Sequence, residues 1–326
     1  MQKNSEFFRK IATNFMGVIL IGTILLSGCT RQAQETTQEI AHEIPSATKI
    51  TTLPLPTERP ITTPHTPDPP PTPAGEFRWT PYAFDRLEGD YRADAIRLAD
   101  AILHYEDEVN MSAAHAQVLC DNFAFEFPPS ALTNLSAEND RVKITYLFSR
   151  DAHEKKIEQF SKNVNLALAR IKQEDSELTR AIKLYDYVVK NVTYFYTDYT
   201  DKDITAFSAF TQGVTICYGF ADAFGYLLRQ TGMKAHLWRG GTYTVNGFSE
   251  HGWCYAQIDG VYYHFDPTWE YSARKNSGKN QYIYFGLSDT KRFGGLSRSC
   301  VSGFGQLEEK CNSYGAPGSL EIELES

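Results

Sequence analysis

The feature that most limits the fold is a proline-rich segment near the N-terminus. Ten of the chain's 15 prolines lie between Pro45 and Pro73, interleaved with threonines. Proline fixes φ and lacks a backbone N–H, so the segment favours extended polyproline II and cannot bury a core. Residues 29–75 are therefore predicted to form a disordered stalk, whose 29 proline-rich residues would reach about 90 Å at about 3.1 Å each. The folded part is expected from about Phe77 onward.

The first 28 residues have the pattern of an export leader. Lys3, Arg9 and Lys10 give a basic start, and an uncharged, mostly apolar run of 16 residues from Ile11 to Leu26 follows. A basic start, a short apolar run and small residues at a cleavage site are typical of a signal peptide. The alternative is a permanent membrane helix, but the run is shorter than the roughly 20 residues that a span needs.

The end of this leader, Leu26-Ser27-Gly28-Cys29, resembles the lipobox of bacterial lipoproteins. The resemblance implies that Cys29 becomes the lipid-modified first residue of the mature protein, anchored at the extracytoplasmic face of a bacterial cell membrane. Disulfides are permitted there. Removing a leader of net charge +2 takes the chain from −8 to −10. An acidic chain argues against nucleic acid and anionic membrane surfaces as partners.

The first part of the folded sequence mixes helical and strand patterns. Residues 76–175 are interpreted as an α/β companion region without site chemistry, and 176–326 as a catalytic core with a C-terminal extension. Cys120 is interpreted as a small buried hydrophobe. Apolar periodicity and capping residues predict one strand, Arg141–Phe148, and four helices: Arg92–Tyr105, Ser112–Phe123, Asp151–Ile171 and Ser176–Asn191.

Cys217 lies where another helix is predicted to begin. The apolar residues after it follow helical spacing as far as Gly232, which ends the helix, and Thr215 is a plausible N-cap. A thiol in the first turn lies near the positive end of the helix dipole, which favours a nucleophilic thiolate. A buried structural cysteine fits the position equally well.

A β-hairpin supplies the groups that would activate this cysteine. Asp259-Gly260 is a strong signal for a two-residue turn, and it sets Ile258 opposite Val261. Counting outward places Trp253 opposite Asp266 and His251 opposite Thr268, all four on one face. His251 and Asp266 are then diagonal neighbours, with Cα atoms about 7–8 Å apart. The other face carries an apolar set suited to the core: Cys254, Ala256, Ile258, Val261, Tyr263 and Phe265.

Three sequence blocks resemble the signatures of the transglutaminase-like superfamily, a papain-related fold. The resemblance extends from about Ser176 to Arg292 and implies an α+β, papain-like domain with its nucleophile at a helix N-terminus and its His and Asp on an antiparallel hairpin. It makes Cys217 the nucleophile, His251 the general base and Asp266 its orienting group, with no cofactor. The blocks are Gly213-x-x-x-Cys217-x-Gly219-Phe220-Ala221, His251-x-Trp253 and Asp266-Pro-Thr-Trp269.

Neighbouring residues receive lesser roles. Gln212 resembles the position of a papain-type oxyanion donor, with the Cys217 N–H as another candidate. Trp253 and Trp269 are interpreted as packing that shields the His–Asp pair from water. Cys254, where relatives often have Asn or a small residue, is assigned to the core, and His264 to the surface as a hydrogen-bonded histidine.

Two further questions concern the remaining cysteines and metals. Cys300 and Cys311 are expected to form a disulfide, since they lie close in sequence in an exported protein. Cys217, Cys254, His251, His264 and Asp266 form an alternative metal-ligand set, but no CxxC or HxxxH spacing supports it. No D-x-D-x-D-G calcium loop is present either.

The sequence thus predicts an exported, thiol-dependent acyl-transfer enzyme. Its substrate would be a protein, a peptide or a cell-wall peptide, attacked at a peptide or glutamine-type amide. Water as acceptor would make it a cysteine protease, amidase or deamidase, and an amine would make it a transglutaminase, a choice that the triad leaves open. The alternatives are a non-catalytic peptide- or wall-binding module and a structural surface protein.

Overall fold

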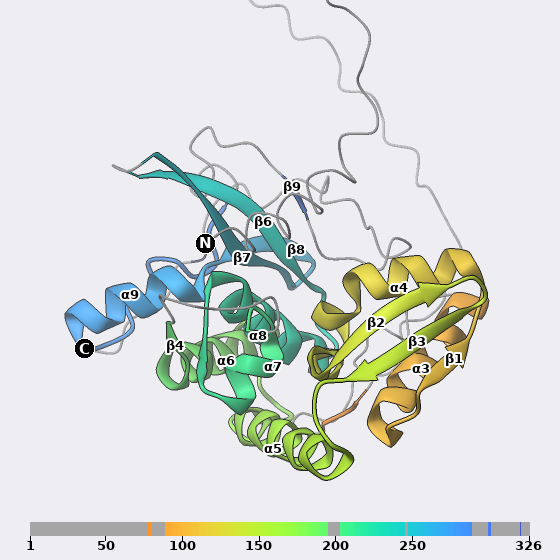
Figure 1. The fold of residues 1–326 in the computed structure, drawn as a ribbon. Helices are drawn as coiled ribbons and strands as arrows, with labels where there is room; N and C mark the ends of the chain where they lie inside the picture. Colours follow the sequence, from red (N-terminus) through yellow and green to blue (C-terminus); the bar gives the residue numbers. More distant parts are fainter. Residues whose placement is uncertain are drawn as a thin grey trace, which may run out of the picture. The chain divides into compact units, whose positions relative to one another are not determined.

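The computed structural model describes residues 77–79, 89–194, 203–244, 247–288, 299–300 and 320. The predicted leader, the lipidation site at Cys29 and the proline-rich stalk lie outside these residues. Among the helices that are described, none is long and apolar enough to cross a membrane. Helices pack with antiparallel sheets in an α+β arrangement, which confirms the predicted class (Figure 1).

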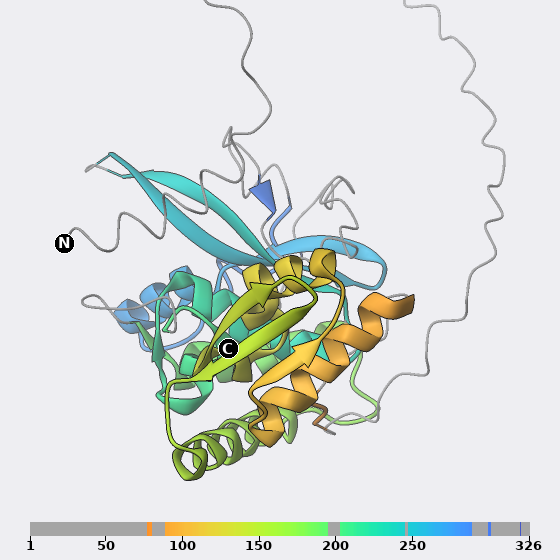
Figure 2. The same cartoon turned by 45° about the vertical axis from the view of Figure 1, so that its right-hand side comes forward.

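The companion region has its own small sheet and apolar cluster. Its three strands are antiparallel in the order β1-β3-β2, and α3 and α4 pack with them (Figure 2). The predicted cap Ser112 is confirmed, because its Oγ accepts the His115 N–H at 3.3 Å. The elements are α3 (Gly89–His104), β1 (Glu108–Asn110), α4 (Ala113–Glu126), the 3-10 helix η1 (Pro128–Leu132), β2 (Thr133–Glu138) and β3 (Arg141–Tyr146).

The second part of the chain places one helix, α8, against a four-stranded antiparallel sheet of order β8-β7-β6-β9 (Figure 1). A short parallel pair, β4 and β5, precedes that helix. The elements are α5 (Arg150–Leu168), α6 (Glu177–Asn191), β4 (Thr193–Tyr194), α7 (Ala206–Thr211), β5 (Val214–Thr215), α8 (Cys217–Gln230), β6 (Ala235–Thr244), β7 (Gly247–Ile258), β8 (Val261–Phe265), α9 (Pro267–Ser277) and β9 (Ser299–Cys300).

Two predicted helix starts have different outcomes. Ser176 caps α6 as the pattern indicates, since its Oγ accepts the Thr179 N–H at 3.1 Å. The predicted start of α5 at Asp151 is wrong by one residue. Ser149 is the cap, and its Oγ accepts the Ala152 N–H. A hydroxyl with extended backbone geometry competes well for this position, and Asp151 then lies in the first turn, where a negative charge favours the helix dipole.

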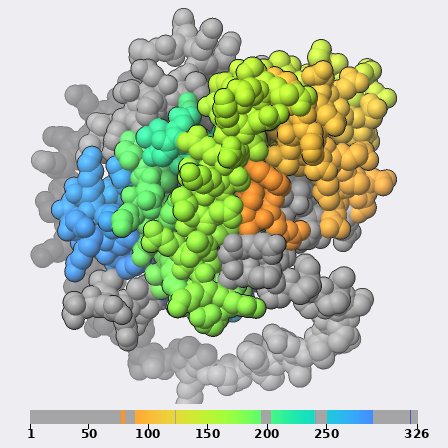
Figure 3. Space-filling view, turned by 90° about the horizontal axis from the view of Figure 1, so that it is seen from below, coloured from red at the N-terminus to blue at the C-terminus, as the bar shows by residue number. Residues whose placement is uncertain are grey.

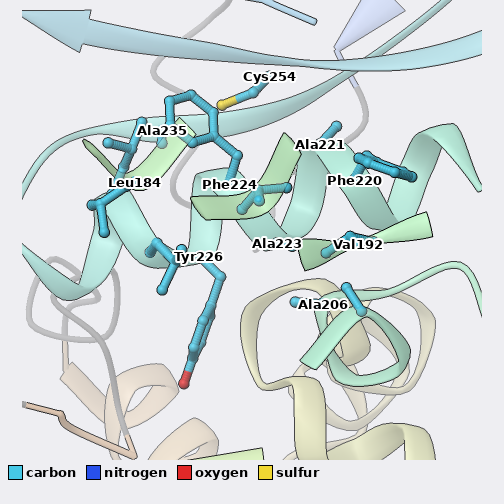
Figure 4. Packing of buried hydrophobic residues seen from close by; sticks show 14 of the residues in the cluster. Leu184, Val192, Ala206, Phe220, Ala221, Ala223, Phe224, Tyr226, Ala235 and Cys254 are labelled. Atoms are coloured by element: carbon cyan, nitrogen blue, oxygen red, sulfur yellow. The ribbon is translucent and has the colours of Figure 1, made fainter. Parts of the chain in front are cut away.

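Every residue of α8 is buried, so this helix is the centre of the core. Cys254 and Ala235 from the sheet lie on one side of it, and Val192 and Ala206 on the other (Figure 4). Cys254 is fully buried, as predicted, and burial raises the pKa of its thiol. Cys254 is thereby held as a neutral thiol in an apolar environment.

Helix α5 shares the apolar cluster of α6 and α8 through residues such as Phe160. The surface of α5 is seen in yellow-green between orange and green residues in Figure 3. Phe77 and Trp79 pack their rings near that of Phe160. Between them, the backbone N–H and C=O of Arg78 form reciprocal hydrogen bonds with the side-chain amide of Gln230, at 2.9 and 2.8 Å. Most residues of this cluster follow the start of α5, but Ala131 and Leu132 of η1 also belong to it. The boundary predicted at residues 175–176 stays a prediction.

The hairpin follows the predicted register over its paired length. Ile258 pairs with Val261 and Cys254 with Phe265, and the turn residues Asp259 and Gly260 both have positive φ. Val261, however, is 38% exposed and does not enter the core. At the edge of the sheet, next to a turn, one face of a strand has little to pack against.

The predicted pairing of His251 with Thr268 is wrong. Strand β8 ends at Phe265, and α9 begins at Pro267 with Asp266 as its N-cap. Proline has no N–H to continue a ladder, but it fits the first turn of a helix. Asp266 therefore lies at a strand-to-helix junction, and Thr268 lies in a helix.

Candidate active site

The thiol lies on the first residue of α8. The N-cap is Ile216, so the prediction that Thr215 caps the helix is wrong. Thr215 ends β5, and its Oγ1 donates to the Asp203 carbonyl at 2.5 Å. Gly219 allows the helix to pass this side chain, because a Cβ at Gly219 would lie 1.8 Å from Thr215 Oγ1. The packing thus requires the glycine two residues after Cys217.

Strand β7 carries His251 past the start of α8. A Cβ at Gly252 would lie 2.6 Å from the ring of Tyr218, so glycine permits the close approach of strand and helix. Cys217 directly precedes Tyr218, and His251 directly precedes Gly252. Both are buried at this close approach, with only 5% and 6% of their surface exposed. The Cys217 side chain lies close enough to His251 to contribute to the raised pKa of the imidazole.

Asp266 completes the cluster from the strand-to-helix junction. It is fully buried, and its Oδ2 accepts the His251 Nε2–H at 2.6 Å. Its Oδ1 accepts the Trp269 N–H at 3.0 Å, which caps α9. One carboxylate thereby both orients the imidazole and begins the following helix. With Nε2 bonded to Asp266, Nδ1 is the ring nitrogen left for the thiol.

The electrostatics of this cluster favour a charged imidazole. Burial by itself lowers the pKa of His251, but the charge and hydrogen bond of Asp266, with a smaller contribution from Cys217, raise it to about 9. An opposite charge within hydrogen-bonding distance stabilises the protonated ring more than desolvation destabilises it. His251 is therefore protonated at neutral pH.

Comparison with known families places these residues in a wider group. The family model of the transglutaminase-like superfamily matches residues 165–267. This part of the chain is similar to the transglutaminase-like superfamily. The matched range contains Cys217, His251 and Asp266, and it ends where α9 begins. No curated protein matches the sequence.

Solved structures with partial similarity are also known. A candidate cysteine protease from Cytophaga hutchinsonii has 24% identity and a TM-score of 0.29, over 34% of this chain and 38% of that one. A TGase has 14% identity and a TM-score of 0.30, over 49% and 48%. A candidate protease from Parabacteroides distasonis has 10% identity and a TM-score of 0.26, over 40% and 35%. This chain spans less than half the length of each.

Aromatic rings surround the imidazole of the transglutaminase-like core. The ring of Trp269 stacks on that of His251 at 4.8 Å and 11°, and Trp253 lies nearly parallel to it at 6.1 Å and 23°. Both predicted packing residues therefore lie beside the histidine. Flat apolar surfaces at this distance limit the access of water to the His–Asp pair.

His264 is not the surface histidine that the sequence suggested. It is fully buried, and its Nδ1 accepts the Trp253 Nε1–H at 3.0 Å. The prediction failed because this face of the sheet is itself covered by an aromatic cluster of Trp238, Trp253, Tyr255 and Tyr262. A histidine is tolerated there since it accepts the indole hydrogen bond.

Other predicted site residues lie away from this cluster or outside the described part. Gln212 is exposed at the end of α7, where its Nε2 donates to Asp203 Oδ1 at 3.4 Å, so the oxyanion role stays a prediction.

Cys300 pairs through its backbone with Trp238, while Cys311 is not described, and their disulfide also stays a prediction. Cys120 is half-buried, and burial raises its pKa to about 12. Within the described ranges, no cluster of His, Cys, Asp and Glu has the geometry of a metal site.

Sequence reasoning missed three residues that support Asp266. Tyr185 of α6 donates its hydroxyl to the Asp266 carbonyl at 3.0 Å, and the Tyr284 carbonyl accepts the Asp266 N–H at 2.8 Å. Glu270, fully buried one turn after Asp266, binds the segment that carries Tyr284. Tyr185 is fully buried on α6, and nothing in the local sequence pattern identifies these partners.

Proposed function

We propose that this protein is a thiol-dependent acyl-transfer enzyme, with Cys217 as nucleophile, His251 as general acid and base, and Asp266 as the group that orients His251. The observation that supports it most is the buried 2.6 Å bond from His251 Nε2 to Asp266 Oδ2, with the Cys217 side chain close enough to contribute to the raised pKa of the same imidazole. Nucleophile, base and orienting group within hydrogen-bonding reach are the pattern of covalent acyl transfer.

The proposed reaction begins with the sulfur of Cys217 as a thiolate beside a protonated His251, and the raised His251 pKa of about 9 supports the charged imidazole of this pair. The sulfur of Cys217 attacks the amide carbonyl and forms a C–S bond. The C–N bond then breaks as His251 gives its Nδ1 proton to the leaving amine, and a thioester remains. An incoming water or amine gives a proton to His251 and attacks the thioester, which restores the thiolate.

Peptide bonds and glutamine-type side-chain amides are the proposed substrates, in proteins, peptides or cell-wall peptides. The same thioester gives hydrolysis with water and transamidation with a primary amine. Trp269 and Trp253, parallel to His251, support a site with little bulk water, which is a condition for transfer to an amine in competition with hydrolysis.

The proposal predicts an acyl-enzyme at a single cysteine. The full chain would be incubated with glutaminyl and alanyl peptide amides, quenched in acid, and examined by peptide-resolved mass spectrometry. An acyl adduct at Cys217, with release of ammonia or amine that is lost in Cys217→Ala, would support the enzyme. If wild type gives no adduct yet binds a peptide as tightly as Cys217→Ala does, the protein is a binding module instead.

We also propose that the protein is exported and held at the extracytoplasmic face of a bacterial cell membrane through a lipid on Cys29. The basis is the leader and the Leu26-Ser27-Gly28-Cys29 sequence. Expression in a bacterial host with radiolabelled palmitate tests it. Label in the wild-type chain that is absent from Cys29→Ser is expected, and equal labelling of both would contradict the anchor.

A further inference from the structure

A buried carboxylate on α9 accepts hydrogen bonds from three backbone N–H groups of a neighbouring segment. Glu270 is fully buried, and its Oε1 accepts the N–H groups of Gln281 at 2.6 Å and Tyr282 at 2.8 Å. Its Oε2 accepts the Tyr284 N–H at 3.2 Å. Hydrogen bonds from backbone N–H groups to a carboxylate are among the stronger ones in proteins, so this carboxylate fixes the segment from 281 to 284.

The segment does not have this conformation by local preference. Tyr282 has a φ of 54°, in the left-handed region that residues other than glycine seldom adopt. Such a conformation costs on the order of 1–3 kcal/mol and persists only where the surroundings determine it. Glu270 Oε1 accepts the N–H groups of Gln281 and Tyr282, directly before this φ angle, and Oε2 accepts the N–H of Tyr284 two residues later.

The same segment contacts the His–Asp pair in two ways. The Tyr284 carbonyl accepts the Asp266 N–H at 2.8 Å and the Tyr185 hydroxyl at 3.2 Å. The Tyr284 ring packs edge-on against Trp269, at 5.4 Å and 69°. Trp269 in turn stacks on His251. A shift of this segment would therefore move the backbone of Asp266 and the ring that covers His251.

We infer that Glu270 is a positioning residue, which fixes Asp266 and Trp269 through the segment that carries Tyr284 and so sets the charge state of His251. The inference rests on the proposed function only for its relevance to catalysis, since the effect on His251 exists in the resting protein. The charged groups that act on His251 are Asp266 and Cys217, and Glu270 acts through the first of them.

Asp186 of α6 offers a matched control. It holds the same loop through side chains, accepting Asn280 Nδ2 at 2.5 Å and the Tyr282 hydroxyl at 2.8 Å. Asp186→Asn and Glu270→Gln each replace one carboxylate that binds this loop by an amide, although Asp186 is only half-buried and Glu270 is fully buried. Only Glu270→Gln weakens the hold on the Tyr284 N–H. A general loss of loop stability would affect both variants alike.

The test is the NMR titration of the full chain labelled with ¹³C,¹⁵N-histidine, with the His251 signal assigned by its loss in His251→Ala. In wild type the His251 pKa is expected near 9. Glu270→Gln is expected to lower this pKa by about one pH unit, and Asp186→Asn by no more than about 0.2. Equal pKa values in Glu270→Gln and wild type, or equal shifts in the two variants, would overturn the inference.

A second variant covers the case in which Glu270→Gln does not fold. Glu270→Asp keeps the charge but shortens the reach, and a smaller downward shift of the same titration is expected. An unchanged titration in a folded Glu270→Asp would count against positioning. The titration does not depend on turnover. If wild type forms no acyl-enzyme, the proposed function fails, but the titration still decides whether Glu270 affects the His251 pKa.

Discussion

The two ends of α8 carry different buried charge clusters. At its N-terminus Cys217 meets His251, which Asp266 orients. Toward its C-terminus Arg229 donates to the Phe125 carbonyl at 2.8 Å and to Asp222 at 3.3 Å, and it lies 3.8 Å from Glu126 of the companion region. All the side chains of this second cluster are buried as deeply as those of the first.

The balance between burial and partners differs at the two ends. Burial raises the pKa of Asp222 to about 7, and Arg229 only partly opposes it; burial likewise raises the pKa of Glu126. Two carboxylates there share one guanidinium, whereas at the other end the imidazole has the Asp266 carboxylate beside it. Deep burial thus produces an ionised pair at one end and favours protonated acids at the other. The first arrangement suits chemistry, and the second joins the companion region to the core.

Replacing the Cys217 nucleophile should show most clearly that the two ends of α8 have different roles. Cys217→Ala is expected to reduce acyl transfer by on the order of 10³-fold or more, because no other thiol lies against His251 in the described part of the chain. The matched control is Cys254→Ala, which should lower stability by about 1–2 kcal/mol and leave the reaction intact. Turnover and urea denaturation of both variants test this. A Cys217→Ala protein with wild-type turnover would contradict the account.

Changing Asp266 to Asn should affect chemistry more than folding. An amide oxygen still accepts the Trp269 N–H, so α9 keeps its cap. The imidazole loses its charged partner, and because burial by itself lowers the His251 pKa, that pKa is expected to fall to its ordinary value of about 6.5 or below. Turnover should drop by on the order of 10²–10⁴-fold, because the base is neither charged nor held in its tautomer. Steady-state kinetics and thermal unfolding would show whether the two effects separate in this way.

Arg229→Met should have the opposite effect, with a large loss of stability and little change in the reactivity of Cys217. It leaves Asp222 and Glu126 buried without their cation, and the loss of one partner of a buried ion pair costs about 3–5 kcal/mol at a pH above the Asp222 pKa of about 7, where that carboxylate is ionised. The companion region also loses the bond from Arg229 to the Phe125 carbonyl. Urea denaturation measures the loss, and the rate of Cys217 modification per folded molecule should stay near wild type. A change of less than about 1 kcal/mol would show that the cluster does not join the two parts.

The smallest expected effect is on the pH dependence of stability. Asp222 has a folded pKa of about 7, above its unfolded value, so its protonated form stabilises the fold at low pH and stability falls as pH rises toward 7. The folded pKa of His251 is also raised, so its contribution is present below about 6.5 and is lost as pH rises through about 9. Asp222→Asn should flatten the lower window and Asp266→Asn the upper one in unfolding experiments from pH 4 to 10. Identical curves of stability against pH for the two variants would contradict the difference between the two ends of α8.

The parts of the site that follow from local pattern were predictable. The Asp259-Gly260 turn determined the register of the hairpin as far as Cys254 and Phe265, and Asp266, one residue beyond the ladder, still reaches His251. Helical spacing after Cys217 placed the thiol at the start of α8, and Ser112 and Ser176 marked helix starts. In each of these cases residues within a few positions determine the geometry.

The parts that depend on distant neighbours were not predictable. His264 was expected at the surface because its strand alone does not reveal the aromatic cluster on that face. The residues that support Asp266 come from α6 and from the segment after α9. In the sequence, Glu270 is recognisable only as an acidic residue in the first turn of a helix. The Arg229 cluster likewise joins Glu126 to residues about a hundred positions later. Such contacts arise from tertiary packing, which a single sequence pattern does not encode.

The rate of Cys217 alkylation as a function of pH tests the central claim most directly. The full chain and His251→Ala would be treated with iodoacetamide between pH 4 and 10, and peptide-resolved mass spectrometry would separate Cys217 from Cys254 and Cys120. The account predicts rapid modification of Cys217 well below about pH 8.5, the pKa of a free thiol, and its loss in His251→Ala. Modification that follows a free-thiol titration in both proteins would contradict a thiolate–imidazolium pair and the enzyme built on it.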